Sequence, residues 1–499
     1  MSADAPPTRS GPQLSLSTKL FYGFGSVAYG VKDQGFSYLL LIFYNQVVGL
    51  PSRTVGLAIM IALAFDALLD PIVGQISDNW RSRWGRRHPF MYAAALPVAV
   101  SYLLLWNPPD WSKEAVFFYL IGVAVLIRSF ITFYEIPSAA LGAELTTDYD
   151  ERTTVMSYRY FFGWIGGITM TLLALRVFLQ PDAEHPVGQL NPAGYVNYGI
   201  AASVIMLAAI LISATGTHRH VARLMVPPKR AWSLRQLAGE MVSTLSHPSF
   251  LVLLLTGLCN AMAQGLVLSL NLYFNTYFWG LTTGQIAFFV VGNIASAVLA
   301  FAFATPLSRI GGKKVAAIWC KVIAFAVAAA PIVLRLSDLF PANGHPAIVP
   351  ILFAQTIFST AFSIVSSILI TSMIADVVED SQLRTGRRSE GLFFSAAAFV
   401  AKAVSGVGIF ASGMILAFVD FPQNAQPGQV AADVVRNLGL TYLATLGVIY
   451  AAAVFLMSRY RITREDHEET VRKLAADAER VEEPGSPETE RELITPRPA

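Results

Sequence analysis

The sequence predicts an all-α membrane protein with about twelve transmembrane helices. Of its 499 residues, 54% are hydrophobic and only 14% are charged, and the mean hydropathy is +0.52. A soluble domain carries about 25% charged residues, so this chain lacks the polar surface that would cover its cores in water. Lipid around the helices explains the deficit. Both cysteines, Cys259 and Cys320, lie in apolar runs, which favours buried thiols over a disulfide framework.

A helix needs about 20 residues to cross a bilayer. The chain contains six apolar segments of this length, then a polar stretch, then six more such segments. Residues 1–18 contain no short apolar run ending in a small-residue cleavage site, so we expect no cleaved signal peptide. The predicted spans lie near residues 21–49, 53–76, 89–107, 115–138, 157–179 and 196–216, and then near 249–279, 284–307, 314–334, 347–375, 391–419 and 436–458.

The loops on one side of the predicted bundle carry most of the Lys and Arg residues. Short basic loops stay in the cytoplasm. We therefore expect an integral protein of the bacterial inner membrane with both termini cytoplasmic. The basic residues of this side are Arg81, Arg83, Arg86, Arg87, Arg219, Arg223, Lys229, Arg230, Arg235, Lys313, Lys314, Arg384, Arg387, Arg388, Arg459, Arg461 and Arg464.

The same pattern divides the chain into five parts. Residues 1–18 form a cytoplasmic N-terminal segment, and the charged residues 460–499 form a cytoplasmic, partly disordered tail. Two six-helix bundles cover residues 19–217 and 249–459. The linker between them, residues 218–248, is cytoplasmic, and its apolar residues recur at helical spacing, which predicts an amphipathic surface helix.

An internal repeat relates the two bundles. An acidic residue, an Asp and an Arg-Thr pair, each four residues apart, follow the fourth span and recur after the tenth at a constant offset of 232 residues (376 minus 144, 384 minus 152). Two parallel six-helix halves around a central cavity form the major facilitator layout. We expect the repeated charges to act as a cytoplasmic gate while the protein faces outward. The gate residues are Glu144, Asp148, Arg152, Asp376, Asp380 and Arg384.

Two carboxylates in the second span form the candidate coupling site. Asp66 and Asp70 lie one helical turn apart and therefore share a face. In a low dielectric, two close carboxylates cannot both stay charged and unpaired. Either one of them is protonated, or a cation lies between them. The alternative is a structural ion pair with Lys402 or Lys32 as a permanent partner.

Other ionisable side chains in apolar spans are candidates for solute binding, because each costs roughly 2.5–3.5 kcal/mol at mid-membrane without a partner or a cavity. Lys32, Asp33, Glu135 and Arg159 offer donors and acceptors of both signs, which suit polyhydroxylated solutes. Interhelical ion pairing is the alternative. Arg128 lies two turns from Glu135, and we interpret it as structural.

Four segments resemble the glycoside–pentoside–hexuronide:cation symporter family, and the resemblance covers nearly the whole chain. They read KLFYGFGSVAYGVKDQG, FDALLDPIVGQISDNWRSRWGRRHPF and FYEIPSAALGAELTTDYDERTTV, and IADVVEDSQLRTGRRSEGLFFS follows later. The resemblance implies that Asp66 and Asp70 are cation-site aspartates with Thr132 beside them. It implies that Lys402 links this site to the solute site. It also implies solute-binding roles for Lys32, Asp33, Glu135 and, more approximately, Arg159.

Departures from the family pattern bear on the cation and the solute. Leu69 stands where sodium-using members often carry an asparagine, and leucine offers no oxygen, which favours a proton over sodium. Ala139 and Ile131 replace a tryptophan and a tyrosine of the best-known member, and Glu135 replaces an aspartate. The resemblance therefore does not carry over that member's substrate.

These features predict a cation:sugar or glycoside symporter that works by alternating access. The expected cation is a proton, with sodium at Asp66 and Asp70 as the alternative. A transporter of a lysolipid-like or other non-sugar solute and a non-transporting membrane sensor stay open. We see no nucleophile–base motif, metal-ligand cluster or phosphate loop, so we expect no enzyme activity and no cofactor. The expected partners are a small polar solute and membrane lipid, with no nucleic acid, and the expected state is a monomer.

Overall fold

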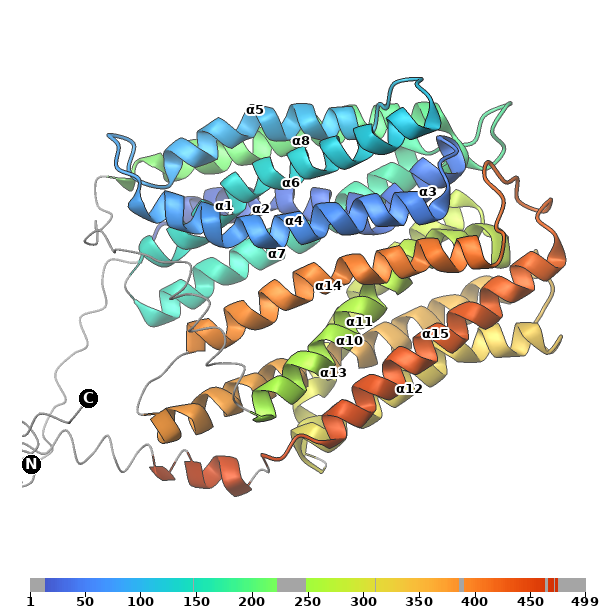
Figure 1. Cartoon of the computed structure of the whole chain (residues 1–499). Coiled ribbons are helices and arrows are strands. Elements are labelled where there is room, and N and C mark those ends of the chain that lie inside the picture. Colours follow the sequence, from blue (N-terminus) through green and yellow to red (C-terminus); the bar gives the residue numbers. More distant parts are fainter. Residues whose placement is uncertain are drawn as a thin grey trace, which may run out of the picture.

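The protein folds into two groups of helices that lie side by side along a common direction (Figure 1). The structure is a computed structural model that describes residues 14–146, 148–221, 248–309, 311–385, 390–462, 465–470 and 472–473. Within these ranges it is helical and contains no strand. We call residues 14–221 the N-half and residues 248–462 the C-half. The predicted all-α, two-bundle fold class is confirmed.

The helices follow the predicted spans closely. In the N-half they are α1 (Leu16–Phe24), α2 (Ser26–Gln34), η1 (Gly35–Leu39), α3 (Leu40–Ile42), η2 (Phe43–Val47), α4 (Ser52–Asn79), α5 (His88–Leu105), α6 (Lys113–Glu144), α7 (Tyr149–Leu173), η3 (Ala174–Phe178), η4 (Gly188–Leu190) and α8 (Pro192–His218). In the C-half they are α10 (Pro248–Tyr273), η6 (Phe274–Phe278), α11 (Thr283–Arg309), α12 (Gly312–Leu336), α13 (Ile348–Thr385), α14 (Glu390–Phe418) and α15 (Ala432–Ser458).

Eleven helices of the described chain are long and apolar enough to cross a membrane. The first predicted span, 21–49, is also helical, but it consists of short α and π segments from α1 to η2. Gly25 between the first two keeps helical dihedrals (φ −58°, ψ −26°), so the run continues as one span. The predicted linker helix lies outside the described residues, as does most of the tail.

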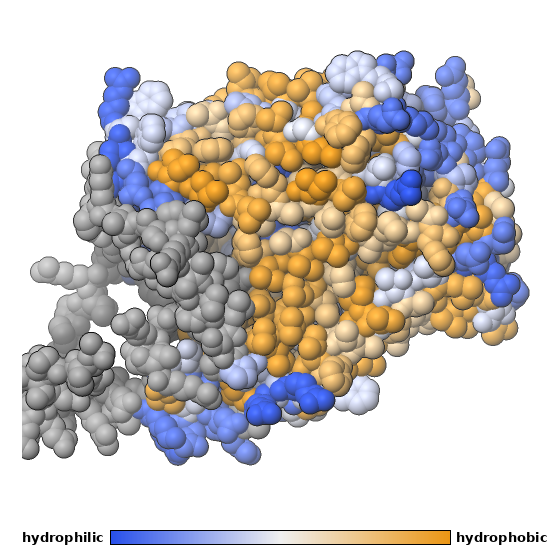
Figure 2. Space-filling view, in the orientation of Figure 1, coloured by the Kyte–Doolittle hydropathy of each residue, from blue (hydrophilic) through white to orange (hydrophobic). Residues whose placement is uncertain are grey.

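Apolar side chains form a broad band across the outer surface, with hydrophilic residues gathered towards the ends of the helices (Figure 2). Phe118, Phe301 and Phe418 are each at least 70% exposed. A band of this kind would be costly in water but matches the hydrocarbon core of a bilayer.

Small residues let helices approach closely within and between the halves. A Cβ built on Gly30 of α2 would lie 1.8 Å from the Gly163 carbonyl oxygen of α7. Across the halves, a Cβ on Gly413 of α14 would lie 2.4 Å from the Ser52 carbonyl oxygen of α4. The Ser52 hydroxyl donates to the Gly413 carbonyl oxygen at 2.9 Å. Close backbone packing of this type holds helices together where lipid removes the hydrophobic drive.

Two buried amides join the halves at the end we call the closed end, which contains residues 45–50, 178–191 and 274–283. The Gln46 amide donates to the Pro422 carbonyl oxygen (3.0 Å) and accepts from the Ala425 N–H (2.8 Å). The Gln189 amide donates to the Thr276 hydroxyl (2.7 Å) and accepts from the Thr283 hydroxyl (2.6 Å). We call the opposite end, with residues 80–88, 309 and 311–314, the basic end.

Candidate functional site

Asp66 and Asp70 project from one face of α4 into the contact with α6 and α14. Asp66 is fully buried and the Asp70 side chain is 22% exposed. The Thr132 hydroxyl on α6 lies 2.7 Å from Asp66 Oδ1 and 3.2 Å from Asp70 Oδ1. The two aspartates therefore share one helix face, as predicted, and Thr132 lies beside them.

Two cations compensate these carboxylates. Lys402 Nζ on α14 lies 2.9 Å from Asp66 Oδ2 and 2.7 Å from Asp70 Oδ2. The Arg128 guanidinium on α6 donates to Asp66 Oδ2 at 2.9 Å, and it also lies over the Phe36 ring. The charges of this cluster balance. The two Oδ2 atoms contact the cations, and the two Oδ1 atoms share the single hydroxyl proton of Thr132. The ion pair with Lys402 that the sequence left open is formed, and Arg128 joins it.

The four predicted solute-binding residues do not form one ion-paired set. Lys32 is fully buried over the Tyr29 ring, and its ammonium lies 4.0 Å from Asp33 Oδ1. Within the described chain, Lys32 Nζ and Glu135 Oε2 are buried without a hydrogen-bond partner. Arg159 donates to the Ser138 hydroxyl and to the Glu135 carbonyl oxygen rather than to its carboxylate. Buried polar atoms of this kind need a partner, which a bound solute would supply.

The predicted gate residues lie at the basic end. Glu144 accepts from Arg86 and Arg87 of its own half, and Asp376 accepts from Lys313 of its own half at 2.6 Å. The two acidic residues related by the repeat, Glu144 and Asp376, are therefore each paired with a basic residue of their own half. Asp148 caps α7 by accepting from the Glu151 N–H, and Arg152 donates to the Ala143 carbonyl oxygen. Asp380 lies on α13, and the Arg384 side chain lies outside the described residues. The gating role stays a prediction.

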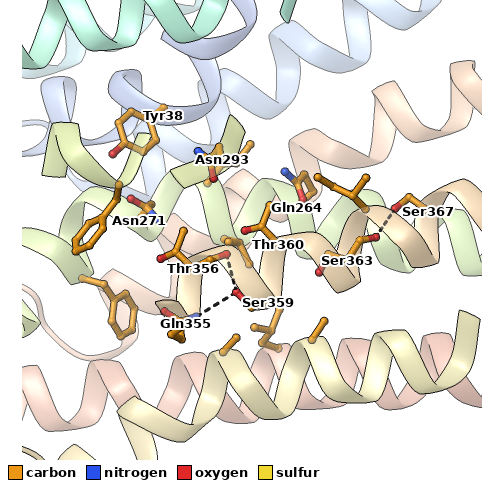
Figure 3. A pocket seen from close by; sticks show the side chains of 18 of the residues that line it. Tyr38, Gln264, Asn271, Asn293, Gln355, Thr356, Ser359, Thr360, Ser363 and Ser367 are labelled. Carbon is orange, nitrogen blue, oxygen red and sulfur yellow. Dashed lines mark hydrogen bonds between the residues drawn. The ribbon is translucent and has the colours of Figure 1, made fainter. Parts of the chain in front are cut away.

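A cavity of about 930 Å³ lies mainly among α10, α11, α12 and α13, with contributions from the N-half. Its polar lining forms stripes along two helices (Figure 3). On α13 the stripe runs at four-residue spacing through Gln355, Ser359, Ser363, Ser367 and Thr371. On α10 it includes Asn260, Gln264 and Asn271, and Asn275 of η6 continues it. The indoles of Trp164 and Trp279 and the phenol of Tyr38 complete the wall.

The predicted layout includes a central cavity but not its lining, and the four solute-binding candidates are not among the lining residues. The candidates were ionisable groups, whereas the lining consists mainly of amides, hydroxyls and apolar side chains. The four-residue spacing of polar residues on α13 is a sequence signal for this polar face. Lys321, an ionisable residue in the middle of the ninth span, was not among the predicted site residues.

A two-half helical bundle with a polar cavity and compensated charges inside its apolar spans defines a membrane carrier of the major facilitator fold. The chain belongs to the family described as MFS/sugar transport protein, whose model matches residues 21–464. It is 25% identical over 452 residues to the putative glycoside/cation symporter YagG of Escherichia coli (90% of this chain, 93% of YagG).

It is also 26% identical over 480 residues to the inner membrane symporter YicJ of Escherichia coli (94% and 97% covered). Among solved structures, a crystal structure of a D-xylose-proton symporter superposes with a TM-score of 0.61 at 15% identity, covering 89% of this chain and 98% of that one. This last likeness concerns the fold alone.

Proposed function

We propose that the protein is a proton-coupled symporter that carries a sugar-like solute across the bacterial inner membrane by alternating access. The observation that carries the proposal is the Lys402 ammonium, which comes from the C-half and contacts both aspartates of the N-half. A change of charge at these carboxylates would therefore act directly on the contact between the two halves. The names of the relatives as symporters agree with cation coupling.

We infer that a proton suits this donor set better than sodium. A hard cation binds through oxygen ligands that are free to coordinate it, but Lys402 and Arg128 already occupy the two Oδ2 atoms, and Thr132 lies against the two Oδ1 atoms. Sodium beside Asp66 would also lie next to the like charges of Arg128 and Lys402. Leu69 adds no oxygen. A proton needs only one carboxylate oxygen.

The coupling would work through the Lys402 bridge. A proton on Asp70, the more exposed carboxylate, would neutralise it and weaken its bond to Lys402, while Asp66 would keep Arg128 as its partner. The protonated and loaded protein would then rearrange. Without the solute, the proton leaves and Lys402 returns to Asp70, so a half-loaded protein stays trapped.

The direction follows from the distribution of basic residues. With the basic end in the cytoplasm, the amides of Gln46 and Gln189 would close the periplasmic side, and the structure would represent an inward-facing state. This orientation would place the linker, the tail and both termini in the cytoplasm. The proposed domain limits stay at 19–217 and 249–459.

The cavity supports a hydrophilic solute. Amides and hydroxyls both donate and accept, which suits a molecule with many hydroxyl groups, and the indoles offer faces for a sugar ring. Lys32 and Glu135, whose buried Nζ and Oε2 atoms have no hydrogen-bond partner in the described chain, would bind the solute in another step of the transport cycle or would contact another part of it. A lysolipid would require a long apolar wall, which these polar stripes interrupt.

The test measures external pH when candidate sugars are added to energy-starved cells that express the protein, with and without sodium. Alkalinisation by one sugar without sodium is the expected result. Sodium-dependent uptake without any pH change would overturn proton coupling.

A further inference from the structure

A short helix beyond the last span packs against the end of α13. Residues 465–470, which we call the tail segment, lie beside α13 at the basic end (Figure 1). The Nδ1 atom of His467 lies 3.6 Å from Oδ1 of Asp376 and 3.3 Å from Oε2 of Glu379, both on α13. Thr470, at the end of the segment, is only 8% exposed. The tail segment is therefore docked on the protein and contacts one of the predicted gate residues.

The chain that leads to the tail segment is fixed on the C-half. Tyr460 is buried in an apolar cluster with residues of α10 and α13, and its hydroxyl donates to the Met373 carbonyl oxygen at 3.3 Å. Lys314 of α12 donates to the Tyr460 carbonyl oxygen at 2.7 Å. This anchor lies seven residues before His467 (467 minus 460). The imidazole therefore meets the carboxylates of α13 at a high effective concentration.

The contact between His467 and Glu379 lacks a hydrogen bond. The two facing atoms, Nδ1 and Oε2, are buried, and neither has a hydrogen-bond partner in the described chain. A neutral imidazole without a proton on Nδ1 turns a lone pair towards the carboxylate, so two acceptors face each other. A protonated ring offers an N–H group and a positive charge instead, which favours a charge-assisted hydrogen bond. Docking should therefore tighten as the pH falls and loosen as it rises through the range of about pH 5 to 8, where histidine changes charge.

The two halves pair their repeated acidic residue differently. In the N-half, Glu144 is paired with two arginines, which stay charged at any physiological pH. In the C-half, Asp376 is paired with Lys313 and lies beside His467. The other titratable side chains on the elements around His467 are Asp380, Lys314, Tyr460, Asp466 and Glu468. Histidine is the member of this set that ordinarily changes charge near neutral pH.

We propose that the tail segment is a proton-sensitive latch, in which protonated His467 bonds to Asp376 and Glu379 and holds the basic end open. Asp376 is then occupied within its own half and does not contribute to the predicted gate. A symporter that imports protons acidifies the side they reach, so the latch slows turnover as protons accumulate. The inference rests on the proposed function for proton import and for the cytoplasmic position of the basic end, and it adds a regulatory contact.

Labelling of single cysteines in the purified full chain in detergent tests the docking. Thr470→Cys, in a chain whose Cys259 and Cys320 are replaced, reports docking because this position is covered in the structure. Glu469→Cys, one position earlier with a side chain that is 51% exposed, reports the intrinsic rate of the maleimide at each pH. We expect the ratio of the Thr470→Cys rate to the Glu469→Cys rate to fall about 3- to 10-fold from about pH 8 to about pH 6.

Substitutions at His467 separate its charge from its presence. His467→Gln should keep the ratio high at both pH values, and His467→Arg should keep it low at both. Glu379→Gln should raise the ratio at the lower pH because it removes one partner of the imidazolium. His345→Gln, in an exposed loop at the closed end, is the matched control and should leave the pH dependence unchanged. A ratio that does not change with pH when His467 is present, or a pH dependence that persists in His467→Gln, would overturn the latch.

A further cysteine measures whether docking holds the basic end open. Thr371 lines the cavity, and Thr371→Cys in inside-out vesicles reports access from the basic end to an impermeant maleimide. At the lower pH, labelling should be at least about 3-fold slower in His467→Gln than in His467→Arg, because only the arginine keeps the latch docked. Equal labelling in the two variants would refute the regulatory role.

The latch and the proposed function fail separately. Neither cysteine measurement needs a solute or a proton gradient, so absence of proton movement with every sugar would leave the docking result standing. Proton-coupled sugar uptake together with docking that does not depend on pH would remove the latch and leave the symporter.

Discussion

The Lys402 ammonium of α14 lies 2.7 Å from Oδ2 of Asp70 on α4 and so joins residues 332 positions apart in the chain. The bond crosses the contact between the two halves, where Gly413 and Ser52 also bring α14 and α4 together. Asp70, the more exposed of the two carboxylates that Lys402 contacts, thereby lies on the surface that has to change during alternating access. The first prediction follows from this bond.

Asp70→Asn should abolish accumulation of solute against a gradient and spare exchange or downhill flow. The amide cannot gain or lose a proton, so the binding of solute is no longer linked to proton movement. Uptake and exchange in vesicles measure both activities, with Asp110→Asn in an exposed loop as the control. Undiminished uphill uptake in Asp70→Asn would refute coupling through this residue.

Arg128→Ala should destabilise the protein and make it respond to sodium. Removal of one partner from a buried ion cluster costs about 3–5 kcal/mol, and Asp66 Oδ2 then has room for a cation. We expect an apparent melting temperature lower by at least about 5 °C, partly restored by sodium chloride but not by choline chloride. Arg53→Ala, at an exposed position of α4, is the control. A sodium response of equal size in the unmodified protein would contradict the interpretation.

Gln46→Ala combined with Gln189→Ala should weaken the closed end. These amides form at least four bonds between the halves, and each neutral bond contributes about 0.5–1.5 kcal/mol. A cysteine introduced at Tyr38, a cavity residue, in a chain whose Cys259 and Cys320 are replaced, reports access from this end. Labelling by an impermeant maleimide should increase several-fold, whereas Gln180→Ala should leave it unchanged.

Arg152→Ala and Arg384→Ala should shift the population towards the state open at the basic end. In this structure Glu144 is bonded to Arg86 and Arg87, so a gate built from Glu144 and Arg152 would form only in the other state. Labelling of a cysteine introduced at Thr371, which lines the cavity, measures the shift, and Arg53→Ala is again the control. Unchanged accessibility from the basic end would count against the gate.

The sequence by itself predicts the spans well, because a segment in lipid must satisfy its backbone hydrogen bonds internally and therefore shows its helix as a continuous apolar run. The first span is an instance: its residues predict a helix correctly, although not its division into α and π segments. The face shared by Asp66 and Asp70 is likewise local, because their four-residue spacing determines it.

Tertiary structure alone decides which faces meet. Nothing near Arg128 in the chain indicates that its guanidinium reaches Asp66, so the sequence leaves it as a structural residue. Lys321 appears in the sequence as one more lysine, and only the fold shows that it is the one charged residue among the described residues that line the cavity. Helix formation depends on neighbours along the chain, but the partner of a buried charge depends on how distant helices pack, and hydropathy does not encode that packing.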